Sequence, residues 1–227
     1  LAGIPIRVGY ARKWDFLLTH KIEDKKYLGL RHEVEYNLEL VELIGATTED
    51  YSLSLGIQDS NLFDEFKDSI AVHPYTSDPI KQWPINNFLE LIKKISQLNE
   101  RVVIVGGKEN LKISKELFYN LSKNIKDMTG RTSLVELGLL LKKCKLLVSG
   151  DSGPVHMASA VGTPVIAIFR NDIPAKSPKR WGPWGKGHIV VEKPSLSEIT
   201  VEEIFSKIKD KLGASSPNTS RNGPRLG

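Results

Sequence analysis

Residues 146–169 alternate an apolar run, a glycine-rich turn, a helix-forming run of small residues and a second apolar run. The turn reads Gly-Asp-Ser-Gly at 150–153 and stands between the first apolar run and the helix. This order is typical of a strand that delivers its carboxyl end to a helix N-terminus and then continues into a parallel strand. Free backbone N–H groups and the helix dipole favour an anion at such a terminus. The segment therefore predicts a phosphate-binding βαβ unit.

The same alternation of strand and helix extends along most of the chain. Strands are predicted at residues 70–73, 101–105, 125–128, 146–149, 165–169 and 189–192, and helices at 85–98, 109–121, 134–142 and 201–212. Connecting helices of this length imply parallel pairing and right-handed crossovers. We therefore expect an α/β fold, a doubly wound, Rossmann-like sheet of about six parallel strands. Its ligand should bind in the crevice at the carboxyl ends of those strands.

Three parts of the chain are expected. Residues 1–45 begin without methionine. They are predicted to contain a short strand, a polar loop at 11–29 and a helix at 32–44 that ends at Gly45. We interpret them as the remnant of a preceding N-terminal acceptor domain with a linker helix. Residues 46–212 form the α/β domain, with a short edge strand at 51–55 where polar and apolar residues alternate. Residues 213–227 have no apolar period and are expected to form a disordered tail.

Composition excludes several classes of protein. Of the 227 residues 40% are hydrophobic, enough for a proper core, but the apolar runs are far shorter than the ~18 residues of a membrane span. The single cysteine, Cys144, excludes an internal disulfide framework and a cysteine-based metal site, and its apolar context predicts a buried thiol. The net charge of +5 suits phosphate ligands or an anionic membrane surface. Arginine clusters interleaved with aromatics are missing, so nucleic acid is not an expected partner.

Three other loops are predicted at the same edge of the sheet. Residues 73–84 are rich in hydroxyls and carry Lys81 just before Trp83 and Pro84. The ammonium of Lys81 either binds a diphosphate or is simply solvated, whereas Trp83 is expected in the core. Residues 105–109 resemble half of a dinucleotide fingerprint without its third glycine. Glu109 there either binds ribose hydroxyls or is stabilised by the helix dipole.

The third loop, residues 129–137, places two hydroxyls at the start of a helix. Thr132 or Ser133 can cap this helix, and Glu136 then completes a capping box. This structural use is the one that the pattern favours for those two side chains.

Gly-Asp-Ser-Gly at 150–153 is compatible with two other interpretations. The same letters surround the nucleophile of trypsin-like proteases, but those are all-β and usually rich in disulfides. A nucleophile elbow requires Gly-x-Ser-x-Gly, and Pro154 occupies the last position here. The second alternative is an ordinary βα turn that binds nothing.

Four motifs in order carry a resemblance to a known family. They are His-Pro with Lys-x-Trp-Pro at 73–84, Val-Gly-Gly at 105–107, Thr-Gly-x-Thr-Ser-Leu-x-Glu-Leu at 129–137, and Gly-Asp-Ser-Gly-Pro-x-His at 150–156. Together they resemble the C-terminal half of the glycosyltransferase family that holds the ADP-heptose:lipopolysaccharide heptosyltransferases. The resemblance covers residues 1–212, and residues 2–9 are similar to the last strand of that family's N-terminal domain. It implies the GT-B arrangement of two Rossmann-like domains, with the N-terminal domain mostly missing here.

The resemblance also implies an activity and a set of site residues. Family members invert the sugar's configuration without a metal ion, and no cofactor is expected. Lys81 and Asp151 are the implied catalytic residues, Lys81 by neutralising the diphosphate and Asp151 by contacting the donor's heptose. Ser152, whose hydroxyl replaces that of the family's commoner threonine, and Gly153 would hold phosphate through their amides. The full implied set for the nucleotide sugar is Lys81, Glu109, Thr132, Asp151, Ser152, Gly153 and His156.

We therefore expect the donor-binding part of a cytoplasmic enzyme that passes heptose, or a related sugar, to a lipopolysaccharide-core-type glycolipid. Peripheral contact with the anionic inner membrane is expected from the basic surface. In the family, the carboxylate that deprotonates the acceptor lies in the N-terminal domain near the chain start, so this chain alone should bind donor without transferring sugar. The alternatives are a sugar-nucleotide epimerase, which shares the two-domain plan, and a stand-alone sugar-nucleotide-binding module.

Overall fold

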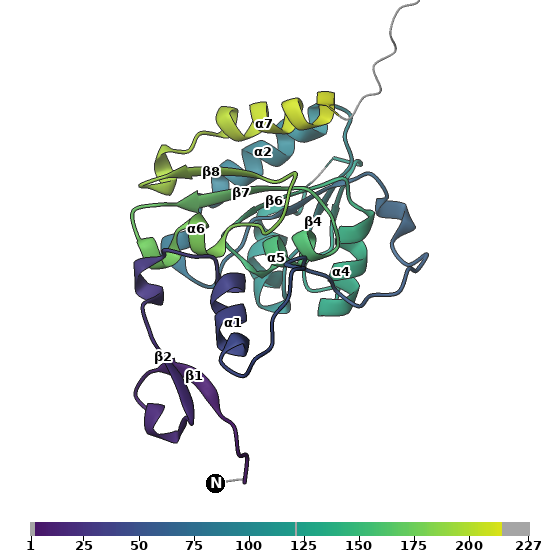
Figure 1. The fold of residues 1–227 in the computed structure, drawn as a ribbon. Helices are drawn as coiled ribbons and strands as arrows, with labels where there is room; N and C mark the ends of the chain where they lie inside the picture. Colours follow the sequence, from purple (N-terminus) through teal and green to yellow (C-terminus); the bar gives the residue numbers. More distant parts are fainter. Residues whose placement is uncertain (1–2, 121, 215–227) are drawn as a thin grey trace, which may run out of the picture.

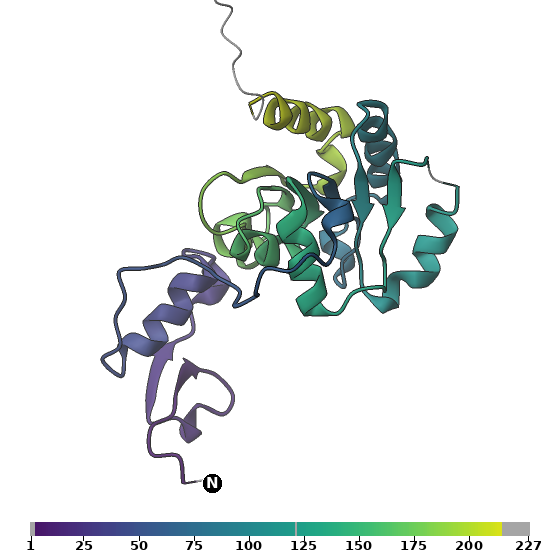
Figure 2. The ribbon, with the colours of Figure 1, turned by 90° about the vertical axis from the view of Figure 1, so that its right-hand side faces the viewer.

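The computed structural model describes residues 3–120 and 122–214. A large α/β domain carries a small N-terminal segment, drawn in purple, that extends away from it at one end (Figures 1 and 2). Residues 215–227 of the expected tail lie outside the described residues, and the last helix continues through Ala214.

The large domain is built on one parallel sheet of six strands, as the alternating pattern predicts. Their order is β5-β4-β3-β6-β7-β8, and every neighbouring pair is parallel. The strands are β3 (Ile70–His73), β4 (Val102–Ile104), β5 (Ile125–Asp127), β6 (Leu146–Gly150), β7 (Val165–Arg170) and β8 (Ile189–Lys193). The chain moves outward in one direction from β3 and in the other from β6. The boundary between β3 and β6 is therefore the topological switch point, where open α/β sheets bind ligands.

Helices cover both faces of this sheet (Figure 1). The helices of the domain are α2 (Ile85–Gln97), α3 (Leu111–Leu117), α4 (Leu134–Lys143), α5 (Gly153–Ala160), α6 (Pro178–Trp181) and α7 (Val201–Ala214). One buried cluster joins α2 and α7 to Ile70 and Val72, and a second joins α4 and α5 to Ala71. Successive residues of a strand point to opposite faces, so each central strand supplies both clusters and is almost wholly apolar.

The N-terminal segment departs from the sequence prediction. Its elements are β1 (Val8–Ala11), β2 (His20–Glu23) and α1 (Glu33–Glu42), and β1 pairs with β2 in parallel. The predicted loop at 11–29 therefore contains a strand. Its sequence, His-Lys-Ile-Glu, has a single apolar residue, so alternation could not identify it and the backbone pairing with β1 defines it.

Two further expectations were wrong in detail. Residues 51–55 form no strand, although their letters alternate. They belong to a segment without regular secondary structure that passes beside α4. A Cβ at Gly138 of α4 would lie 2.4 Å from Ile57 and 3.6 Å from Leu55.

The helix predicted at 109–121 is divided into a 3₁₀ turn and a short α3, and residue 121 lies outside the described part. The 3₁₀ turns are η1 (Asp15–Leu17), η2 (Lys26–Leu28), η3 (Asp64–Phe66), η4 (Pro79–Lys81), η5 (Lys108–Asn110), η6 (Pro174–Lys176) and η7 (Leu196–Glu198).

Specific polar contacts attach the N-terminal segment to the loop after β7. His32 caps α1, forming a capping box with Glu35, and its Nε2 donates to the carbonyl of Gly182 at 2.9 Å. Glu33 forms an ion pair with Lys26 at 2.5 Å, and Arg180 Nε donates to the same carboxylate at 2.9 Å. Lys26, only 6% exposed, also lies over the Tyr10 ring at 4.3 Å. These groups fix the segment against η6 and α6.

Gly29 makes the closest backbone approach at this junction, which gives a first prediction. Its φ is +59°, and a Cβ there would lie 2.0 Å from the carbonyl oxygen of Pro174. Alanine combines left-handed strain with a steric clash, so Gly29→Ala should lower the free energy of unfolding by about 3 kcal/mol. Urea denaturation measures this, with Gly45→Ala as the control because Gly45 shares a positive φ (+80°) but faces open space. Equal effects of the two substitutions would contradict the role of the Pro174 contact.

Candidate functional site

A cavity of about 470 Å³ lies at the carboxyl edge of the sheet, at the switch point between β3 and β6. Loops that follow β3, β4, β6 and β7 line it. The structure brings together in this cavity all of the residues predicted for the site except Thr132, namely Lys81, Glu109, Asp151, Ser152, Gly153 and His156. These motifs, distant in the sequence, therefore lie together at one edge of the sheet, as predicted.

The N-terminus of α5 opens into the cavity with unused donors. Ser152 is its N-cap, but its hydroxyl caps no helix amide and instead lies 2.9 Å from Ser149 Oγ and 3.1 Å from His73 Nδ1. Val155 N–H donates to the Ser152 carbonyl, and Pro154 has no N–H. No described residue accepts a hydrogen bond from the N–H of Ser152 or Gly153. These two amides are therefore left to bind an anion, helped by the helix dipole.

Lys81 and Asp151 form the central charged pair. Lys81 Nζ lies 2.7 Å from Asp151 Oδ2, with the two side chains 19% and 8% exposed. Lys81 also hydrogen-bonds this carboxylate, so the pair is a charge-assisted contact. Burial raises the pKa of Asp151 above its ordinary value, while the charge of Lys81 acts in the opposite direction. Asp151 also lines the cavity, and a carboxylate paired with one ammonium can still accept a hydrogen bond from a ligand.

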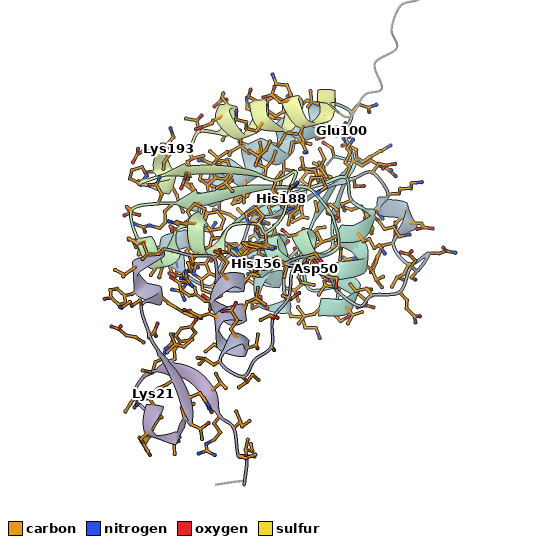
Figure 3. The ribbon with its side chains drawn as sticks, in the orientation of Figure 1. Lys21, Asp50, Glu100, His156, His188 and Lys193 are labelled. Atoms are coloured by element: carbon orange, nitrogen blue, oxygen red, sulfur yellow. The ribbon has the colours of Figure 1, made fainter. Side chains whose placement is uncertain are left out.

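Two histidines border the charged pair. His156 lies on α5, on the side of the domain that faces the N-terminal segment (Figure 3). Burial is the main cause that lowers the pKa of His156, and the nearby His32 and Lys81 act in the same direction. Burial also lowers the pKa of His73 to about 4, so this ring is neutral at neutral pH. Both rings are therefore neutral hydrogen-bonding groups beside the N-terminus of α5.

Glu109 and Thr132 differ in their relation to the cavity. Glu109 lines it, and its carboxylate folds over Gly107, where a Cβ would lie 2.1 Å from Oε1. Glycine is therefore required at that position for the carboxylate to keep this place. Thr132 does not line the cavity, and the adjacent Ser133 caps α4 in a box with Glu136. The structural interpretation of this loop is thereby confirmed, with Ser133 as the cap.

Several lining residues were not predicted. The hydroxyls of Thr76 and Ser77 and the amide of Asn110 face the same cavity, as does the indole of Trp181. The hydroxyl-rich composition of the loop after β3 was a usable signal for the first two. Trp181 had none, since its position depends on how the loop after β7 folds back.

The comparison with protein families identifies the family of this chain. The family described as glycosyltransferase family 9 (heptosyltransferase) matches residues 1–208. The chain is a member of glycosyltransferase family 9.

Individual relatives agree with this membership. The lipopolysaccharide core heptosyltransferase OpsX of Haemophilus influenzae is 26% identical over 189 residues, which are 80% of this chain and 52% of the relative. Lipopolysaccharide heptosyltransferase 3 of Escherichia coli K12 is 27% identical, over 84% of this chain and 62% of the relative. The chain thus spans about half to three fifths of the length of these two proteins.

The fold is also that of solved family 9 structures. The structure of E. coli ADP-heptose lps heptosyltransferase II superposes with a TM-score of 0.76 at 22% sequence identity, covering 94% of this chain and 71% of that one. This likeness confirms the expected GT-B type of fold.

Family 9 membership also resolves the serine-hydrolase alternative. A histidine does contact the serine of Gly-Asp-Ser-Gly, because His73 Nδ1 lies 3.1 Å from Ser152 Oγ. A hydrolytic triad also needs a carboxylate hydrogen-bonded to that histidine, and none of the described carboxylates is. The serine–histidine contact here holds the turn that precedes α5. Elsewhere in the described residues, Cys144 is buried, as predicted, and burial raises its thiol pKa to about 12.

Proposed function

We propose that this chain is the donor-binding part of an inverting, metal-independent heptosyltransferase. The enzyme would transfer heptose, or a related sugar, from ADP-heptose to a lipopolysaccharide-core-type acceptor. The single observation that carries the proposal is the cavity at the switch point, in which a helix N-terminus with two free amides stands beside the Lys81–Asp151 pair. Membership of family 9 and the names of its relatives support the choice of heptose and ADP.

The diphosphate of the donor would lie at the N-terminus of α5. The amides of Ser152 and Gly153 point their dipoles at it, and Lys81 adds a full positive charge. Departure of the nucleoside diphosphate builds negative charge on the same oxygens, so donors already in place stabilise the transition state. In this proposal Lys81 and the helix terminus take the role that a divalent ion has in other transferases.

The remaining residues would bind the two ends of the donor. Asp151 would accept a hydrogen bond from a hydroxyl of the sugar, with His156 assisting beside it. Glu109 would accept hydrogen bonds from the ribose hydroxyls. Thr132 stays a predicted contact of the nucleotide, although it lies outside the cavity lining.

Activation of the acceptor and contact with the membrane are functions that we assign to the whole enzyme. Inverting transfer needs a base for the acceptor hydroxyl. Of the carboxylates that line the cavity, Asp151 is paired with Lys81 and Asp78 with Lys176, at 2.6 Å, and Glu109 is assigned here to the ribose. We therefore expect this chain to bind donor without transferring sugar. A glycolipid acceptor and the net charge of +5 favour peripheral contact of a cytoplasmic enzyme with an anionic leaflet.

No helix in the described part of the chain is long and apolar enough to cross a bilayer.

Calorimetric titration with ADP, UDP and GDP tests the proposal. ADP should bind most tightly, and incubation with ADP-heptose and a lipopolysaccharide-core acceptor should give no transfer by this chain alone. A preference for UDP would point instead to the epimerase alternative, and the absence of binding to all three nucleotides would contradict the donor site.

Gly153→Ala provides a second test because the protein itself leaves room for the new methyl group. A Cβ at Gly153 would have no protein atom within 4 Å, so the substitution should not lower stability. If phosphate lies on this amide, the methyl group meets it, and the Kd for ADP should rise about tenfold. Gly56→Ala is the matched control, since Gly56 also faces open space but lies outside the cavity. Unchanged ADP affinity in Gly153→Ala would place the phosphates elsewhere.

A further inference from the structure

The indole of Trp181 forms one aromatic wall of the cavity. Trp181 ends α6, in the loop that returns from β7, and it lines the cavity together with Asp151 and His156. Its side chain is half-buried, so part of the ring remains open. The His156 ring stands edge-on to it, with centroids 6.3 Å apart and planes inclined by 61°.

The ring is held in place before any ligand arrives. Its Nε1–H donates to the carbonyl of Ala175 at 3.0 Å, and the guanidinium of Arg180 lies 4.9 Å from its centroid. Arg180 is itself fixed by Glu33 of the N-terminal segment at 2.9 Å. Because the indole N–H is already satisfied, the ring offers a ligand only apolar surface. Because it is already ordered, a ligand that packs on it loses little conformational entropy of the protein.

The cavity places groups that suit different ligand atoms side by side, because Lys81 Nζ lies 2.7 Å from Asp151 Oδ2. The amides of Ser152 and Gly153 and the ammonium of Lys81 suit phosphate. The carboxylate of Asp151 is more than nine-tenths buried and has accepting sites beyond the one that Lys81 occupies, so it suits a donor such as a hydroxyl and repels a phosphate. A carboxylate acceptor beside a fixed aromatic face matches a sugar ring, which has hydroxyls on its edge and C–H groups on its face.

We infer that Trp181 is the platform of the donor-sugar subsite. The apolar face of the pyranose packs on the indole while a ring hydroxyl donates to Asp151. This inference rests on the proposed function, since it assigns the sugar end of the same donor. Trp181 thereby determines whether the site binds the intact sugar nucleotide more tightly than the nucleotide alone.

Paired titrations with ADP and with ADP-heptose test the inference. In Trp181→Leu the Kd for ADP-heptose should rise about tenfold, whereas the Kd for ADP should stay within about twofold of the wild-type value. Trp181→Phe keeps an aromatic face and should retain most of the affinity for ADP-heptose. Trp184→Leu is the matched control, because Trp184 lies in the same loop, stacks on His32 at 4.6 Å and does not line this cavity.

The outcomes separate this inference from the proposed function. If the wild-type chain does not bind ADP, the donor site is wrong and the subsite falls with it. If the wild type binds ADP but Trp181→Leu weakens both ligands equally, or neither, the donor site stands and Trp181 is not the sugar platform. Quenching of tryptophan fluorescence by ADP-heptose gives a second readout. It should be lost in the folded Trp181→Phe variant and kept in Trp184→Leu, and persistence in Trp181→Phe would overturn the inference.

Discussion

Lys81→Met should raise the Kd for ADP by about 100-fold. Methionine keeps most of the apolar stem but removes the charge that the diphosphate would meet, and truncating one member of a desolvated charged contact weakens binding by about 2–5 kcal/mol. Calorimetry measures the change. Lys142→Met is the control, because Lys142 also forms an ion pair, with Asp59 at 2.5 Å, but on an exposed surface away from the cavity. An ADP affinity within threefold of wild type would remove Lys81 from the site.

The same substitution should give stability a pH dependence with a defined sign. Burial already raises the pKa of Asp151, and Lys81 opposes that rise, so Lys81→Met should raise the pKa further. A carboxyl whose pKa is higher in the folded state destabilises the fold as pH rises from its unfolded to its folded value. The variant should therefore be less stable than wild type at pH 7 and approach it as the pH is lowered through the carboxyl range. Urea denaturation of both proteins at several pH values in that range measures whether their free energies of unfolding become equal at low pH.

The sheet and its edge were predictable from the sequence for physical reasons. Strands buried on both faces are short, continuous apolar runs, and the helices between them allow only parallel, right-handed connections. Those two facts place the loops after residues 73, 105 and 150 at one edge. Lys81, Glu109 and Asp151 could therefore be assigned to one cavity although 70 positions separate the first from the last.

The elements that escaped prediction depend on contacts with distant parts of the chain. The strand β2 exists because β1 offers its backbone, and its own side chains give no alternating signal. Residues 51–55 alternate without pairing in a sheet, and of these residues Leu55 lies near Gly138 of α4, a contact that alternation alone cannot distinguish from strand pairing. Trp181 lines the cavity from a loop that distant contacts hold in place, since Glu33 binds Arg180 although 147 positions separate these two residues. Local patterns carry no information about such partners.

Trp83→Ala should have the largest effect on stability, about 4 kcal/mol. Trp83 is fully buried, packs edge to face on Phe88 with centroids 4.8 Å apart, and donates its indole N–H to the carbonyl of Ile199 at 2.9 Å. Alanine leaves a large cavity in the cluster between the sheet and the α2–α7 layer, and it leaves a buried carbonyl without its donor. Denaturant unfolding measures the loss, and a change below 1 kcal/mol would contradict the packing.

Trp83→Phe then separates the two functions of the Lys-Gln-Trp-Pro motif. Phenylalanine retains most of the packing on Phe88 but not the hydrogen bond to Ile199, so stability should fall by only about 2 kcal/mol. Trp83 points into the core rather than into the cavity, so the folded variant should bind ADP within about twofold of wild type. Lys81→Met, by contrast, should lose much of the affinity for ADP at neutral pH. If Trp83→Phe weakened ADP binding as much as Lys81→Met, the motif would act as one structural unit, and the assignment of its lysine to the diphosphate would lose its support.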